Sequence, residues 1–172
     1  MEERGDLNLY RPLVNNPVTA VDAFGFKIKD PPANLGFTLE DVEFAVRLAH
    51  KCGIRGPDGM SLLRMYLQML QCPETLSWRL SNSSDTPATL VYPPTSRNPE
   101  ITWPKKADPK SRQKDTPGTG GSMFYFHAAV LHELVHAYGR MTGQGDLDRD
   151  AVRVGNELNR LIDEMLNRDQ PD

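Results

Sequence analysis

The sequence contains few cysteines, no long apolar run and no excess of basic residues. Only Cys52 and Cys72 occur among its 172 residues, too few for a disulfide framework, so we expect two buried free thiols. No segment approaches the roughly 18 apolar residues of a membrane span, and the N-terminal residues lack the apolar core of a Sec signal peptide. The formal net charge of −3 argues against nucleic-acid binding, which requires a strongly basic surface. We therefore expect no membrane span and no nucleic-acid partner.

The composition is typical of one folded domain. A chain of 172 residues, of which 38% are hydrophobic, can bury a single core. Residues 1–36 are rich in Asn, Pro and Gly and show no periodicity, which predicts an irregular N-terminal arm. Residues 37–172 are predicted to form the single domain, and we expect it to be a monomer.

Apolar residues recur at helical spacing in four segments. The first segment begins at Thr38, where Asp41 completes a capping box, and Gly53 is a plausible end. The second ends at Cys72, because a proline follows. The predicted helices cover residues 38–53, 61–72 (or from Asp58), 123–141 and 147–166.

Short runs with β propensity occupy the middle of the chain. The candidate strands are Leu76–Leu80, Ala88–Tyr92 and Glu100–Trp103. Because Pro104 follows the last of them, we expect that strand at a sheet edge, where it can pair with an extended peptide. The basic and Gly-rich residues 104–122 are predicted to form a solvated surface loop. Strands and helices together predict an α+β fold, mostly helical with a small, mainly antiparallel sheet.

Two of the four histidines lie in His132-Glu133-Leu134-Val135-His136, an H-E-x-x-H pattern within a predicted helix. Residues four apart lie one turn apart on the same helix face, so both imidazoles can reach one metal ion. Neutral imidazole nitrogens suit Zn²⁺. Glu133 can take a proton from metal-bound water and return it to a leaving amine. We therefore predict one Zn²⁺ per chain, bound by His132 and His136, with Glu133 as the catalytic general base.

The other two histidines do not fit this arrangement. His127 is five residues before His132, which rotates it away from the ligand face, and His50 lies on the first helix without a companion. We interpret both as ordinary surface or core histidines. Candidate donors to an oxyanion, close in sequence to the pattern, are Tyr138, Arg153 and Arg160.

A hydrolytic zinc site requires a third protein ligand from outside this pentapeptide. The longer pattern H-E-x-x-H-x-x-G-x-x-H is excluded, because Thr142 replaces its final histidine. Gly139 is expected to end or bend the helix, or to allow close packing. If the last two helices form an antiparallel hairpin, acids near the start of the final helix reach the level of the metal, and those that do not bind it can orient a ligand histidine. The candidates are Asp146, Asp148, Asp150 and Glu157.

The segment Leu131–Tyr138, followed by Met141-Thr142-Gly143, resembles the short zinc metalloproteases that bacteria deliver as type III effectors, the NleD-type effector peptidases. It is similar, more distantly, to clostridial neurotoxin light chains. In that group an acid-initiated helix follows the H-E-x-x-H helix, and residues 148–156 fit this frame, with Asp in place of Glu and Gly155 where Glu is common. The resemblance implies a small zincin-like metalloprotease fold. It also implies Asp148 as the third metal ligand, with Asp150 and Glu157 as the alternatives.

The resemblance further implies a zinc-dependent endopeptidase that cleaves a host protein, often one in signalling. It implies synthesis in the bacterial cytoplasm, secretion without a Sec signal and translocation into the host cell. The alternative is a zinc-stabilised binding or regulatory protein in which Glu133 is idle. A third interpretation, a peptidase domain of a larger toxin, has the same chemistry.

Overall fold

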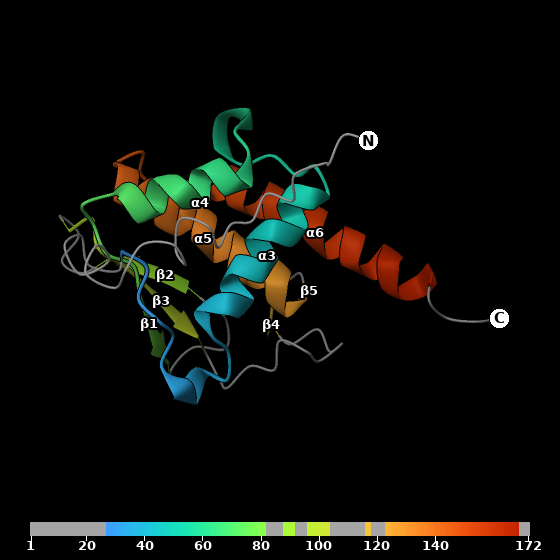
Figure 1. The fold of residues 1–172 in the computed structure, drawn as a ribbon, viewed down its shortest axis with the longest axis horizontal. Helices are drawn as coiled ribbons and strands as arrows, with labels where there is room; N and C mark the ends of the chain where they lie inside the picture. The colour runs from blue at the N-terminus through green and yellow to red at the C-terminus, as the bar shows by residue number, and fades with distance from the viewer. Residues whose placement is uncertain (1–26, 82–87, 92–95, 104–115, 118–122, 169–172) are drawn as a thin grey trace, which may run out of the picture.

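The computed structural model describes residues 27–81, 88–91, 96–103, 116–117 and 123–168. Within them, four α-helices surround or flank two small sheets (Figure 1). The helices are α3 (Leu39–Lys51), α4 (Leu62–Gln71), α5 (Phe126–Thr142) and α6 (Asp148–Arg168), with short 3₁₀ turns η1 (Ala33–Leu35) and η2 (Pro57–Gly59). The strands are β1 (Ser77–Leu80), β2 (Ala88–Val91), β3 (Pro99–Trp103), β4 (Thr116–Pro117) and β5 (Met123–Phe124). The predicted α+β class, mostly helical, is confirmed.

The starts of α3 and α4 follow local capping chemistry. The Thr38 backbone N–H donates to Asp41 Oδ2 (2.8 Å), and the Asp41 N–H donates to Thr38 Oγ1 (3.4 Å), so the predicted capping box is present. Ser61 Oγ accepts from the Arg64 N–H at 3.2 Å and caps α4. Each side chain satisfies a backbone donor that the first helical turn leaves unpaired.

The third helix begins later than predicted. Residues Met123–Phe124 form strand β5, which pairs antiparallel with β4, and α5 starts only at Phe126. Apolar residues at this junction satisfy the helical period and the strand equally well, so periodicity could not separate the two.

The main sheet has the order β1–β3–β2 and is mixed. Strand β1 is parallel to β3, with Ser77 opposite Glu100, whereas β2 is antiparallel to β3. The prediction of a mainly antiparallel sheet is therefore wrong for the β1–β3 pair. The reason is topological: β2 pairs with the far side of β3, which leaves β1 beside a strand that runs in its own direction.

Strand β3 is the centre of the sheet, so the prediction that Glu100–Trp103 is an edge strand open to a peptide is also wrong. Its Ile101, Thr102 and Trp103 are almost completely buried. A strand covered on both faces is a run of buried residues instead of an alternating one. Pro104, on which the edge assignment depended, lies outside the described residues.

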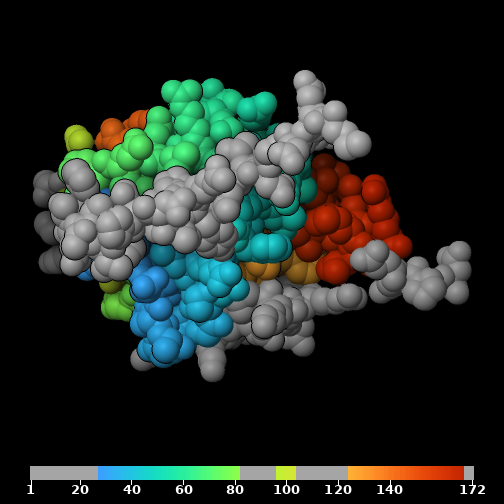
Figure 2. Space-filling view, viewed as in Figure 1, coloured from blue at the N-terminus to red at the C-terminus, as the bar shows by residue number. Residues whose placement is uncertain are grey.

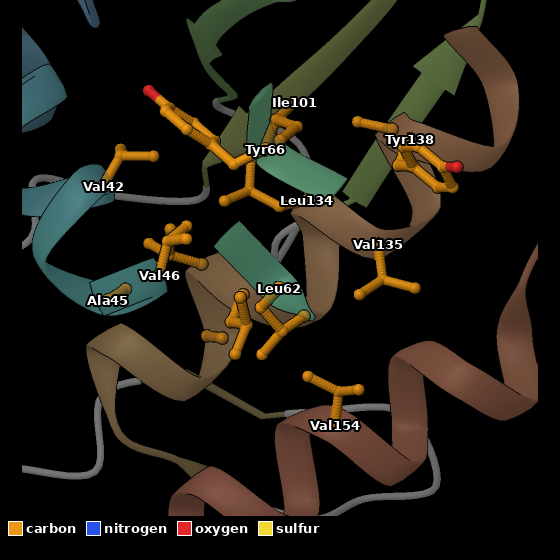
Figure 3. Close-up of a cluster of buried hydrophobic side chains, with 14 of the residues drawn as sticks. Val42, Ala45, Val46, Leu62, Tyr66, Ile101, Leu134, Val135, Tyr138 and Val154 are labelled. Carbon is orange, nitrogen blue, oxygen red and sulfur yellow. The ribbon is translucent and has the colours of Figure 1, made fainter. Parts of the chain in front are cut away.

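Helix α5 is the central element of the core. It contacts α3, α4 and α6 as well as strands β2, β3 and β5, and nearly all of its residues are buried. Leu134 lies among side chains that include Tyr66 and Ile101, while Val135 points toward Val154 of α6 (Figure 3). A helix that packs on all sides is apolar all round, so the polar residues it carries must have partners or a function.

Helices α3 and α4 lie next to one another on the face shown in Figure 2, and the C-terminal half of α6 extends to one side. Residues 27–37 pack against the sheet: the Lys29 N–H donates to the Leu76 carbonyl (3.0 Å), and Ile28 and Leu35 are fully buried. These residues thus join the core, whereas residues 1–26 of the predicted arm lie outside the described residues. Most of the predicted loop 104–122 does too.

Both cysteines are free, as predicted, but Cys52 is exposed and Cys72 is half-buried, so their predicted burial is wrong. Cys52 directly follows the last turn of α3, where the chain turns away from the core. Within the described residues, every helix is too short or too polar to cross a bilayer.

Candidate metal centre

The α5–α6 hairpin is closed by a tight turn. Gly143 ends α5 in the left-handed conformation (φ 74°), and the Gln144 N–H donates to the Gly139 carbonyl at 2.9 Å. A Cβ on Gly139 would lie 2.4 Å from the Gly145 carbonyl oxygen and 2.8 Å from Leu147 Cγ. Gly139 therefore allows the turn to fold back onto α5, which confirms the prediction of close packing.

The two histidines of the H-E-x-x-H pattern converge. Their Nε2 atoms lie 3.1 Å apart, on consecutive turns of α5, and both residues are buried. Two nitrogens bound to one tetrahedral zinc at about 2.0–2.1 Å would lie about 3.3–3.4 Å apart. The spacing of the two lone pairs therefore fits a single metal ion between them.

Apolar packing on the opposite helix positions His132. Phe124 forms an edge-to-face contact with its ring at 5.6 Å. A Cβ on Gly155 of α6 would lie 3.2 Å from His132 Cβ and 2.7 Å from the Phe124 ring, so only glycine allows this approach of the helices. The family-like glutamate is absent at this position because α6 packs directly against the histidine here.

The environment keeps His132 neutral at pH 7. Burial and the neighbouring His136 lower its pKa to about 4, although the Ala151 backbone and Asp146 act in the opposite direction. Its Nδ1 is buried and makes no hydrogen bond of good geometry with a described residue. A neutral imidazole is the form that binds a metal.

Glu133 lies beside the pair. Its Oε1 is 3.9 Å from His132 Nε2, and the residue is only 6% exposed. A carboxylate at this distance from the putative position of a bound ion is close enough to contact a water shared with that ion.

The second ring nitrogen of His136 faces two acids. Asp146 Oδ1 lies 2.5 Å from Nδ1, and Asp148 Oδ1 lies 3.8 Å from it. Asp146 Oδ2 accepts from Arg140 at 2.9 Å. Burial acts to raise the pKa of Asp146, but its hydrogen bond and charge interaction with His136, and the charge of Arg140, lower it below the usual value. The His136, Asp146 and Asp148 side chains form a group that could hold a metal ion.

The remaining predicted ligands are engaged elsewhere. Asp150 accepts from Arg153 at 2.8 Å, and Glu157 lies 3.9 Å from the same guanidinium. Asp148, which is 78% exposed in its side chain, is the one of the three whose acid group lies near a metal-binding histidine.

The candidate oxyanion donors also have other partners. Tyr138 donates to Gln68 of α4 at 2.8 Å, and Arg153 donates to the carbonyls of Arg55 and Gly56. Arg160 pairs with Glu164 within α6. In the described part of the chain, their polar contacts hold elements together and do not reach the paired imidazoles.

The two other histidines lie away from the pair. His127 is half-buried against the rings of Phe44 and Phe126, where burial lowers its pKa. His50 is exposed in the last turn of α3.

Sequence reasoning included Asp146 among four acids but did not single it out, and it overlooked Arg140. No local period connects Asp146 with His136, because a turn of irregular backbone separates them. The one available signal was Gly139, whose missing side chain allows that turn to approach the helix.

A scan against protein-family models finds no match to the chain, and searches of curated proteins and of solved structures find none either. The assignment of function thus depends on the geometry of the site.

Proposed function

We propose that this chain is a zinc-dependent peptidase in which His132 and His136 bind the metal and Glu133 is the general base. The observation that carries the proposal is the convergence of the two Nε2 atoms, 3.1 Å apart, with the Glu133 carboxylate 3.9 Å from one of them. Polar groups of this kind are costly on a buried helix unless they share a ligand.

The donor set suits zinc in particular. Two imidazole nitrogens and one carboxylate are a common ligand set of hydrolytic zinc sites, which leave one position open. Bound zinc would polarise a substrate carbonyl and lower the pKa of a water molecule toward 7.

Asp148 is the proposed third ligand. It begins α6 one turn before Ala151, at the level of His136, and its exposed side chain is the most accessible of the three candidate acids. Asp150 and Glu157 are disfavoured because Arg153 lies within 4 Å of both carboxylates.

Glu133 would perform the proton transfers. Its Oε atoms would take a proton from the attacking water and then deliver it to the leaving amine nitrogen. Burial keeps this carboxylate beside the imidazoles and away from bulk solvent, as such a relay requires.

The resemblance to the effector peptidases, which rests on residues 131–143 and 148–156, extends the proposal to the biological setting. On that basis the substrate is a host protein, the fold is zincin-like, and the chain reaches the host cell by secretion without a Sec signal. These extensions are independent of the metal chemistry and are tested separately.

The test combines metal content with cleavage. Purified protein should retain about one zinc per chain, and His132→Ala should lose it. Glu133→Gln should keep both fold and zinc but lose at least about 100-fold in cleavage of a peptide library or a host extract. Glu164→Gln, an exposed change on α6, is the matched control and should behave as the wild type.

Two outcomes would count against the proposal. Protein that binds no zinc would refute the metal centre. Protein that keeps zinc and its stability while Glu133→Gln changes no measurable function would instead favour the alternative, a zinc-stabilised binding or regulatory protein.

A further inference from the structure

We propose that Asp146 and Arg140 form a positioning pair that fixes the orientation and the tautomer of His136, an inference that rests on the proposed function. Asp146 touches His136 on the nitrogen that faces away from His132. Arg140 lies one turn after His136 on the same face of α5 and holds the other oxygen of that carboxylate at 2.9 Å. Together they form a chain of three side chains that ends at the metal-facing Nε2 atom.

The distances identify Asp146 as a hydrogen-bond acceptor and not as a metal ligand. Its Oδ1 is 2.5 Å from His136 Nδ1, which is a short hydrogen-bond distance. Two ligand atoms on one tetrahedral zinc would lie about 3.3 Å apart. The second oxygen is already used by the guanidinium of Arg140, so neither oxygen remains for a metal.

This contact determines which nitrogen of His136 carries the proton. A carboxylate can only accept, so Nδ1 must donate, and Nε2 is left with its lone pair. That lone pair points at His132 Nε2, 3.1 Å away. The pair therefore prepares His136 for a metal before any metal arrives, which is how acids behind ligand histidines raise metal affinity.

The turn between α5 and α6 places Asp146. Gly139 allows the Gly145 carbonyl to approach α5, and the Gln144 N–H bonds to the Gly139 carbonyl. A methyl group at position 139 would meet backbone at 2.4 Å, which real structures do not tolerate, so the turn would have to move. The position of Asp146 thus depends on a residue that has no polar side chain.

The first measurement uses metal-free protein. Nitrogen chemical shifts of ¹⁵N-labelled histidine at neutral pH report which ring nitrogen of His136 is protonated. The wild type should show the Nδ1–H tautomer for His136, and Asp146→Ala should show a mixture or the Nε2–H form. Assignment comes from the signal that disappears in His136→Gln.

The second measurement is zinc affinity, by competition with a chromogenic chelator. Asp146→Ala should weaken zinc binding by about 10–100-fold, and Gly139→Ala should weaken it as well although it removes no polar group. Gln144→Ala, in the same turn, and Glu164→Gln, a charge change on α6, should leave both measurements unchanged. Circular dichroism checks that every variant is folded.

The two readouts separate this inference from the proposed function. Failure of the wild type to bind zinc would refute the metal centre, yet the tautomer of the metal-free protein would still test the pair. An unchanged His136 tautomer in Asp146→Ala would overturn the positioning role, and so would unchanged zinc affinity in a chain that does bind zinc.

Discussion

The buried His132 predicts a specific loss of stability in acid for the metal-free protein. Its pKa is about 4 in the folded chain and about 6.5 in an unfolded one. As the pH falls below about 6.5, the unfolded state takes up a proton that the folded state refuses until about pH 4. The free energy of unfolding therefore decreases across this window as the pH falls.

The size of the effect follows from the gap between the two pKa values. One pH unit corresponds to about 1.4 kcal/mol, so the gap corresponds to about 3 kcal/mol, most of it lost between about pH 7 and pH 4.5. His132 is 2% exposed, so solvent screens the effect little. This is a large share of the 5–15 kcal/mol typical of a domain.

Two other groups titrate near this range. Burial also lowers the pKa of His127, which adds to the loss in acid. Burial raises the pKa of Glu43, so the folded state takes up that proton earlier and gains stability as the pH falls. Both contributions are shared by the wild type and a His132 variant, and they cancel when the two proteins are compared.

The assay is urea unfolding of dialysed, metal-free protein, followed by far-ultraviolet circular dichroism at about pH 7 and about pH 4.5. His132→Gln has no titrating ring and should lose about 2–3 kcal/mol less than the wild type between the two pH values. His50→Gln, an exposed change on α3, is the matched control and should follow the wild type. Equal losses in wild type and His132→Gln would refute the argument from burial.

Two further predictions concern the elements that support the site. Thr38→Ala removes both hydrogen bonds of the capping box on α3, because the changed cap loses its hydroxyl and the partner of Asp41, and should cost about 1 kcal/mol in urea unfolding; no change would show that the cap is redundant. Leu134→Ala, at a fully buried position of α5, should cost about 2–5 kcal/mol because it leaves a cavity. Leu67→Ala, at a 41% exposed position of α4, is its control, and equal costs at the two positions would contradict the assigned burial.

Much of the secondary structure could be predicted from sequence because its signals are local. Thr38 and Ser61 cap the helices that they precede, and the three candidate strands became β1, β2 and β3. The order of those strands could not be predicted, since pairing depends on which edge of β3 each neighbour meets. The sequence signal at Trp103 was misread because the following proline suggested an edge, whereas burial on both faces placed the strand in the centre.

The sequence by itself determined that His132, Glu133 and His136 occupy one buried helix with the two imidazoles a turn apart, because the helical period leaves no other arrangement. Only the tertiary structure decided what surrounds them. Asp146 reaches His136, and α6 packs against His132, because Gly139 and Gly155 have no side chains to prevent the approach. Such close contacts depend on the shape of two surfaces that meet after folding, and no spacing along the chain records that shape.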